Sequence, residues 1–243
     1  MSSKQINIVL PVYNEENRIK DGLNTLLEYL LQNPSINYVI TILDNGSTDK
    51  TPEISDDYCK MNHRIRYERI EEKGVGIAFK RAVELNNSDF IGYMDIDMST
   101  DINALGTTYK MLTEDDSIDI VNASRYSQGS QLIGRTRVRN FISYVWVFIL
   151  KKVLRMKSND SICGFKFFRQ GVITRLLCES SECEYGWFLI IEVIIRAERM
   201  GYHIYELPVK WIFNDETKVK MLKVTISYLR GVKRLKKSLQ RGG

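Results

Sequence analysis

The sequence predicts an α/β fold in which helices cover both faces of a mostly parallel sheet. Short apolar runs of strand length alternate with amphipathic stretches of helical length through the first half of the chain. The composition, 44% hydrophobic and 27% charged residues, is that of a folded globular protein. Because ligands bind at the carboxyl ends of strands in such sheets, we expect the chemistry of this protein in the residues that follow each apolar run.

The elements of the first half are expected in a strand–helix order. An apolar run stops near Pro11, and the polar stretch after it carries Leu23, Leu26 and Leu30 at helical spacing. The polar turn at residues 44–49 follows a β-rich run and offers an N-cap for the next helix. Strands are therefore predicted at residues 6–12, 38–43, 65–68, 90–94 and 118–123, and helices at residues 15–32, 51–61 and 75–85.

The second half breaks this alternation. Residues 135–157 are basic, then apolar at 141–150, then basic again, and residues 184–200 are predicted to form a helix. Residues 221–239 predict an amphipathic helix. Its expected apolar stripe consists of Leu222, Thr225, Leu229, Val232, Leu235 and Leu239.

Charge is concentrated at the end of the chain. The last 26 residues hold nine of the 35 Lys and Arg and none of the 30 Asp and Glu. Such a tail favours an anionic partner. Nucleic acid is not expected, because Tyr228 is the tail's one aromatic residue and bases stack on aromatic series.

Several protein classes are excluded or disfavoured. The longest nearly apolar run, residues 141–150, is about half of the ~20 residues that cross a bilayer, so no membrane span is expected. Four cysteines without a CxxC pair, together with two histidines, form no recognisable zinc cluster. A reducing cytosol is the expected compartment, since nothing at the N-terminus resembles a signal peptide.

Two carboxylates follow one predicted strand. Asp95 and Asp97 flank a single apolar residue directly after the run at 90–94. A divalent cation would satisfy both, and Mg²⁺ is usually held by one or two carboxylates plus substrate phosphates. The tripeptide alone is more typical of a solvated loop than of a metal site. Asp44 ends another predicted strand, where it could be a site residue or simply begin a turn with an N-cap. Residues 73–78 form a weak phosphate-loop pattern.

The order of these motifs resembles the family 2 inverting glycosyltransferases of the GT-A fold. Later stretches narrow the resemblance to polyprenyl (dolichyl) phosphate hexosyltransferases, and it covers residues 6–235. The matching stretches are residues 9–15, 44–49, 73–78 and 95–97, and then 123–126, 135–143, 161–166, 187–192 and 208–211.

The resemblance implies a role for each matching residue. Asp95 and Asp97 would hold Mg²⁺ or Mn²⁺ against a diphosphate, and Asp97 and Arg125 would be catalytic. The acceptor phosphate would be bound by Arg125, Arg139 and Ser143. The nucleotide sugar would be bound by Pro11, Tyr13, Glu15, Asp44, Lys73 and Asp95, with Asp44 near the base. Residues 1–215 would be a GT-A catalytic domain with a Rossmann-like sheet, and residues 216–243 a basic amphipathic helix.

Two departures bear on the donor. Asn45 stands where the family commonly has a second Asp, which weakens the assignment of the base site. Ser99 stands where many mannosyl-transferring members have a Gln that supports the metal. With residues 163–166, it looks more like the glucosyl branch. UDP-glucose is therefore the expected donor, and GDP-mannose is the close alternative.

The acceptor follows from the same resemblance. A polyprenyl or dolichyl phosphate has a second pKa of about 6, so it is largely ionised near neutral pH and needs positioning and partial desolvation more than deprotonation. If the acceptor were a hydroxyl, Asp97 or Glu192 would be the candidate base. Basic helices with an apolar stripe lie in the membrane interface, so we expect peripheral binding to an anionic membrane from the cytoplasm.

Three alternatives remain at this point. Residues 141–150 are equally consistent with burial in the core or in a homodimer. The acceptor is a soluble or cell-surface saccharide in a second interpretation of the same fold. In a third, the protein binds nucleotide sugars without catalysis.

Overall fold

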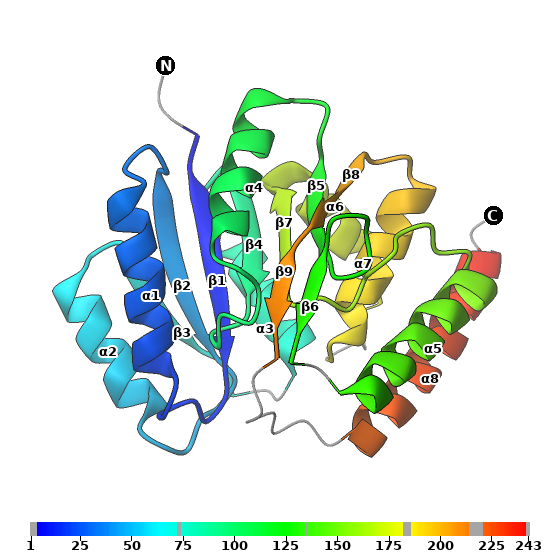
Figure 1. The fold of residues 1–243 in the computed structure, drawn as a ribbon, viewed down its shortest axis with the longest axis horizontal. Coiled ribbons are helices and arrows are strands. Elements are labelled where there is room, and N and C mark those ends of the chain that lie inside the picture. Colours follow the sequence, from blue (N-terminus) through cyan, green and yellow to red (C-terminus); the bar gives the residue numbers. More distant parts are fainter. Residues whose placement is uncertain (1–3, 72–73, 135, 182–185, 214–220, 242–243) are drawn as a thin grey trace.

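A seven-stranded sheet lies at the centre of the protein, as the computed structural model shows (Figure 1). The structure describes residues 4–71, 74–134, 136–181, 186–213 and 221–241, with the backbone alone at 137–139, 221–224 and 241. The sheet consists, in spatial order, of β3 (Ile65–Arg69), β2 (Tyr38–Asp44), β1 (Ile6–Val12), β4 (Phe90–Met94), β7 (Phe165–Arg169), β5 (Ile120–Ser124) and β8 (Ile204–Pro208).

The pairing makes the sheet mostly parallel. β1 pairs in parallel with β2 and β4, β2 with β3, and β5 with β8, whereas β7 is antiparallel to both β4 and β5. A second sheet of two short parallel strands, β6 (Gln131–Ile133) and β9 (Lys210–Ile212), lies outside it. The carboxyl ends of β1, β2 and β4 consequently meet at one edge.

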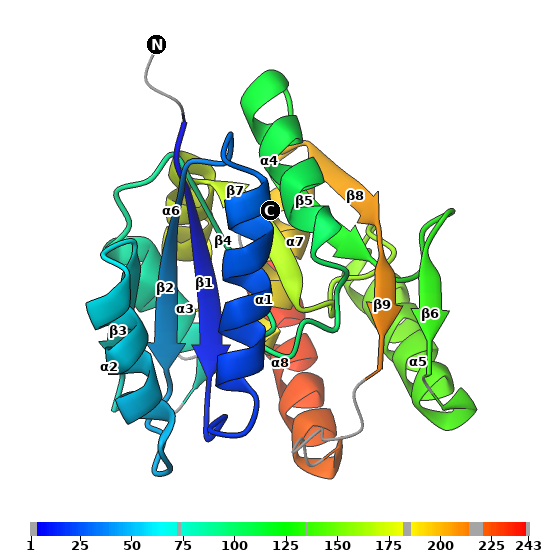
Figure 2. The same cartoon turned by 60° about the vertical axis from the view of Figure 1, so that its left-hand side comes forward.

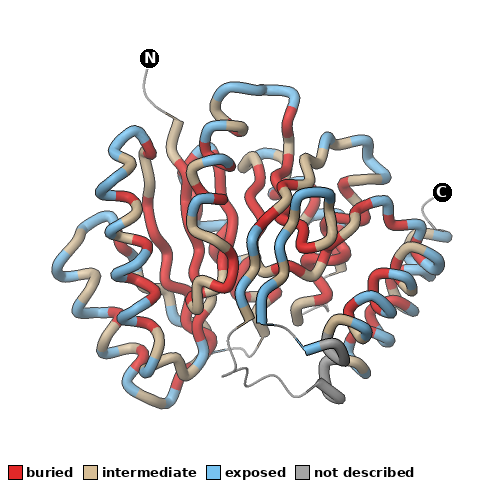
Figure 3. Tube along the Cα trace, in the orientation of Figure 1, coloured by how far each residue is buried: buried red, intermediate tan, exposed pale blue. Residues whose placement is uncertain are grey.

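Helices cover both faces of the large sheet (Figure 2). α1 (Ile19–Gln32), α2 (Thr51–Met61) and α4 (Asn103–Glu114) contribute to the core on one face. α3 (Val75–Glu84), α6 (Gln170–Glu179) and α7 (Phe188–Arg199) contribute to the core on the other. The strands between the two layers are buried over almost their whole length (Figure 3).

A third layer consists of α5 (Arg137–Leu154) and α8 (Met221–Arg241), which pack on each other and on α7. From α5, Leu150 and Leu154 enter this core, and from α8, Val232 and Leu235 do so. Gly231 allows the approach of α8, since a Cβ there would lie 2.4 Å from the ring of Phe188. In the described part of the chain, no helix has both the length and the apolar character needed to cross a membrane.

The predicted fold class is confirmed, and most elements of the first half lie within one or two residues of their expected bounds. The helix predicted at residues 15–32 begins four residues later, because the N–H groups of Glu15 and Glu16 donate to Thr51 and Asp49 instead. The strand predicted at 118–123 spans Ile120–Ser124. α4, α6, β6, β7, β8 and β9 were not predicted.

Two predictions for the second half need correction. The helix predicted at 184–200 is α7, which begins at Phe188; residues 184–185 lie outside the described residues. The stripe predicted for α8 is wrong at Leu229, which is 51% exposed, whereas its neighbour Tyr228 is buried. The expected domain boundary at 215–216 also lies outside the described residues.

Candidate active site

A cavity of about 760 Å³ lies at the carboxyl ends of β1, β2 and β4. The loops after these strands contribute to its lining, as do α5, α8, β9 and Trp187, which directly precedes α7. The lining includes seven predicted site residues: Pro11, Tyr13, Glu15, Asp95, Asp97, Arg125 and Ser143. These seven predicted residues therefore lie together in one cavity.

The loop after β1 is fixed to the loop after β2. Asn14 adopts a left-handed backbone conformation (φ 55°), which Asn tolerates better than most residues. Its side-chain oxygen accepts the Thr48 N–H at 2.8 Å, and its own N–H donates to Ser47 Oγ at 2.9 Å. Glu15 pairs with Arg18, whose Nε lies 2.7 Å from Oε2. These contacts hold Tyr13 and Glu15 on the cavity wall.

Asp44 is completely buried beside the cavity, whose lining includes its neighbours Leu43 and Asn45 but not Asp44 itself. Its Oδ1 accepts the N–H and hydroxyl of Ser47, and its Oδ2 accepts the hydroxyl of Tyr67 at 2.7 Å. Burial, together with the hydrogen bond to Asp44, raises the pKa of Tyr67, so Tyr67 remains the donor. In this structure Asp44 organises the turn after β2.

Asp95 and Asp97 are close enough to affect each other electrostatically. Burial, followed by the charge of Asp97, raises the pKa of Asp95 to about 7, although part of Asp95 stays open to the cavity. Among the described residues, no N–H or hydroxyl donates to the Asp95 carboxylate. Asp97 accepts the N–H of Ser99 at 3.0 Å. Within this part of the chain, an ionised Asp95 therefore lacks a direct partner.

This donor set fits a divalent cation. Two carboxylates that open onto one cavity, one of them without a hydrogen-bond donor in the described residues, are relieved by a 2+ charge. Within the described ranges, no cluster of three or more His, Cys, Asp and Glu has the geometry of a metal site. Asp95 and Asp97 would thus be the two protein ligands, with phosphate oxygens and water completing the shell, as is usual for Mg²⁺.

The predicted phosphate-binding residues have different surroundings. Arg125 is buried in the cavity wall, and its Nε and Nη2 lie 2.7 and 3.0 Å from the carboxylate of Asp160. Ser143 is on α5 and lines the cavity. Arg139 is in the first turn of α5, where its side chain is not described, and Lys73 lies outside the described residues.

A large part of the remaining cavity lining is apolar. It includes all three tryptophans of the chain, which come from three different elements or their flanks. Sequence reasoning missed this set, although Trp187 and Trp211 lie inside motifs that it had singled out. The apolar lining consists of Ile142, Trp146, Ile162, Trp187, Trp211, Phe213 and Tyr228. Glu192, the other candidate base, is buried outside the cavity and accepts Arg196 Nε at 2.9 Å.

Residues 7–177, more than half of the chain, match the model of the family described as Glycosyl transferase family 2. The chain belongs to glycosyl transferase family 2. This family 2 member is therefore a glycosyltransferase, and the predicted resemblance is confirmed.

Curated relatives agree with this membership. Glycosyltransferase AglD of Haloferax volcanii is 29% identical over 90% of this chain, which spans 35% of AglD. A dolichyl-phosphate beta-glucosyltransferase of Saccharomyces cerevisiae is 25% identical over 94% of this chain and 76% of that protein. A protein of the same name from Trichomonas vaginalis is 29% identical over 90% of this chain and 69% of that one.

Solved structures show the GT-A fold of this family 2 member. The chain is similar to glucosyl-3-phosphoglycerate synthase from Mycobacterium tuberculosis in complex with Mn²⁺, uridine diphosphate and glucosyl-3-phosphoglycerate. The TM-score is 0.72 at 15% identity, over 98% of this chain and 80% of that chain. A complex of the same enzyme with Mn²⁺, UDP-glucose and phosphoglyceric acid gives 0.69 at 16% identity, over 97% and 80%.

Proposed function

We propose that this glycosyltransferase moves a hexose from a nucleotide sugar to a polyprenyl or dolichyl phosphate, with UDP-glucose favoured as donor over GDP-mannose. The observation that carries the proposal is that one cavity is lined both by a carboxylate pair and by a tryptophan-rich apolar set of side chains. A lipid phosphate likewise combines a charged phosphate group with an apolar chain. The relatives named dolichyl-phosphate beta-glucosyltransferase support this acceptor and this sugar.

The carboxylate side suits the donor. Breaking the anomeric bond places negative charge on a nucleoside diphosphate, and cationic groups aimed at that charge stabilise the transition state. Asp95 and Asp97 would hold Mg²⁺ or Mn²⁺ here, and the ion would supply positive charge to the leaving diphosphate. The complexes of similar fold that contain Mn²⁺ and UDP support this assignment. Pro11, Tyr13 and Glu15 would border the nucleotide.

The proposed assignments of Lys73 to the nucleotide sugar and of Asp44 to the base depend on the motif resemblance alone. Asp44 would act through the turn that it organises, because its carboxylate is buried beside the cavity.

The polar residues that line the cavity beside the carboxylates suit a phosphate acceptor. Arg125 and Ser143 share the cavity with the aspartates, and Arg139 would join them from α5. A guanidinium suits phosphate oxygens, because its planar N–H groups match them in pairs. An ionised phosphate monoester attacks without losing a proton, so these residues need only orient it. Attack from the face opposite the leaving group inverts the anomeric carbon and converts an α-linked donor into a β-linked product.

The surface beside the cavity suits a membrane. On α5, Phe141 and Phe148 are 69% and 60% exposed, and on α8, Ile226 and Leu229 are also exposed. Lys233, Lys236 and Lys237 are exposed further along α8. Exposed apolar side chains with flanking lysines are typical of helices that lie on anionic bilayers. We therefore propose peripheral attachment to the cytoplasmic face of a membrane, with self-association through the same side chains as the alternative.

The direct test is transfer of labelled glucose from UDP-glucose, or labelled mannose from GDP-mannose, to polyprenyl phosphate with Mg²⁺ or Mn²⁺. We expect label in the lipid phase, more from UDP-glucose, and its loss with EDTA or in Asp97→Ala. Leu31→Ala is the matched control, since Leu31 is exposed on α1 away from the cavity. No lipid label with either donor would reject the acceptor, and label with a soluble saccharide would establish the alternative one. A fully active Asp97→Ala would reject the metal site.

A further inference from the structure

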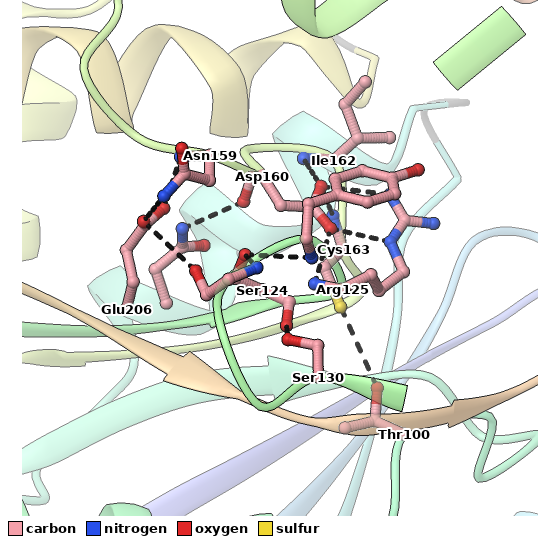
Figure 4. Close-up of polar contacts among 12 residues, drawn as sticks. Thr100, Ser124, Arg125, Ser130, Asn159, Asp160, Ile162, Cys163 and Glu206 are labelled. Carbon is pink, nitrogen blue, oxygen red and sulfur yellow. Dashed lines mark hydrogen bonds and ion pairs between the residues drawn. The ribbon is translucent and has the colours of Figure 1, made fainter. Parts of the chain in front are cut away.

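Asp160 lies in the loop between α5 and β7, and none of the proposed functional roles uses its side chain. Its carboxylate accepts five N–H groups from two segments of the chain (Figure 4). Three come from Arg125: its backbone N–H at 3.1 Å, Nε at 2.7 Å and Nη2 at 3.0 Å. The other two are the backbone N–H groups of Ile162 and Cys163, at 3.1 and 3.2 Å from Oδ1.

The hydrogen bonds from Arg125 to Asp160 fix the direction of the Arg125 side chain. With two nitrogens on Asp160, the guanidinium is held in one plane, 5.3 Å from the ring centre of Tyr126 and 5.6 Å from that of Trp211. Trp211 and Arg125 both line the cavity. A bidentate pair constrains orientation as well as distance, so the N–H groups of Nη1 and the second N–H of Nη2 remain to meet a phosphate.

The hydrogen bonds from the backbone of Ile162 and Cys163 connect Asp160 to the loop that contacts Asp95. Oδ1 of Asp160 fixes the backbone at Cys163, and Lys166 Nζ donates to the carbonyl of Cys163 from inside the protein. The next residue, Gly164, accepts the N–H of Asp95 at 3.1 Å. Its Cα is so close to the Asp95 carboxylate that a Cβ on Gly164 would lie 1.8 Å from Oδ2. The loop therefore forms part of the support of Asp95.

We infer that Asp160 is a positioning residue that holds Arg125 and the Asp95 carboxylate in the mutual geometry required for transfer. This inference rests on the proposed function. Asp160 is not the proton acceptor of the reaction, because it has no exposed surface and both of its oxygens already accept N–H groups. Burial would raise its pKa, but the Arg125 ion pair outweighs burial and holds the pKa below its usual value.

The test compares Asp160→Asn with Glu198→Gln. Glu198 also accepts backbone N–H groups from this part of the chain, at Lys157 and Ser158, but it does not line the cavity. Both variants should be less stable than the parent protein. Asp160→Asn alone should lower kcat for transfer about 100-fold, the size expected for misplaced reacting groups, with a smaller change in the KM for the donor.

Two further readouts separate positioning from general stability. The affinity for Mn²⁺ in the presence of UDP, measured by electron paramagnetic resonance titration, should fall in Asp160→Asn and stay unchanged in Glu198→Gln. In an Arg125→Lys background, Asp160→Asn should have much less effect on kcat than in the parent protein, because residues in one network are not additive. The Mn²⁺ titration needs no acceptor, so it tests Asp160 even if polyprenyl phosphate proves to be the wrong substrate.

The inference is overturned if Asp160→Asn behaves like Glu198→Gln in kcat and Mn²⁺ affinity, or if its effect adds fully to that of Arg125→Lys. If Asp160→Asn does not fold, Asp160→Glu serves instead, since it keeps the charge and moves the carboxylate by one methylene. A folded Asp160→Glu with kcat within about threefold of the parent value would then overturn the inference, and a loss comparable to about 100-fold would support it.

Discussion

The Asp95 carboxylate lies against the Cα of Gly164, with the Asp95 N–H donated to the Gly164 carbonyl at 3.1 Å. Because a Cβ would fall 1.8 Å from Oδ2, Gly164→Ala must displace either Asp95 or the loop. We expect transfer to fall at least about 100-fold and Mn²⁺ binding to weaken, since a displacement near 1 Å has that effect on reacting groups. Steady-state kinetics and Mn²⁺ titration measure both.

Gly171→Ala is the matched control for this substitution. Gly171 lies in α6, and a Cβ there would meet no atom within 4 Å, so alanine is accommodated. It should leave transfer unchanged and raise stability by about 0.5–1 kcal/mol, as alanine does relative to glycine within a helix. Wild-type kinetics in Gly164→Ala would show that the Asp95 carboxylate is not confined by the loop.

Asp95 makes the metal-free protein less stable at high pH. Its pKa of about 7 lies above the ordinary value of 3.8, so between these values the folded state keeps a proton that the unfolded chain has released. The contribution of Asp95 to the free energy of unfolding is fully present below about pH 4, and it is lost as the pH rises through 7. Asp95→Asn should therefore be more stable than the parent protein at pH 8 in EDTA, by about 1–4 kcal/mol, while losing transfer activity.

Urea unfolding at pH 5 and pH 8 measures this difference, and Asp49→Asn provides a control of opposite sign. Burial would raise the pKa of Asp49, but the N–H groups of Thr51 and Glu16 hold it below the ordinary value. Removing that carboxylate should lower stability at pH 8. If Asp95→Asn were also less stable than the parent protein at pH 8, Asp95 would not be an uncompensated carboxylate.

The parallel strands β1, β2 and β3 are predictable because each is a short run of strand length that is followed by a stretch of helical length. β7 is not, because Lys166 and Arg169 interrupt its apolar pattern and its antiparallel partners lie far away in the sequence. α4 was missed for a local reason. Gly106, Thr107 and Thr108 have low helix propensity, and the apolar contacts of the helix come from the sheet.

The same distinction applies to the site. Asp95 and Asp97 were found because they directly follow an apolar run, a signal that the local sequence contains. Asp160 follows no strand, and its partner Arg125 is 35 residues earlier, so only the folded chain brings them together. The apolar wall was missed because Trp146, like its neighbours in residues 141–150, had several equally good interpretations in the sequence.

The side chains of α5 lie in two different environments. Trp146 and Leu150 enter the core with α7 and α8, whereas Phe141 and Phe148 lie on the exposed side. If that side enters the bilayer interface, Phe141→Ser with Phe148→Ser should greatly reduce flotation with vesicles that contain anionic lipid. The matched control is Leu31→Ser with Met61→Ser, which removes two exposed apolar side chains from α1 and α2.

The kinetic consequence distinguishes membrane attachment from self-association. The Phe141 and Phe148 double variant should transfer poorly to polyprenyl phosphate in vesicles and normally to the same acceptor in detergent, because the cavity itself is intact. Binding to anionic vesicles should also weaken as salt rises, since the exposed lysines of α8 contribute roughly 1 kcal/mol each at low salt. Unchanged flotation of the double variant, with a shift from dimer to monomer in sedimentation, would assign this side of α5 to a second copy of the chain instead.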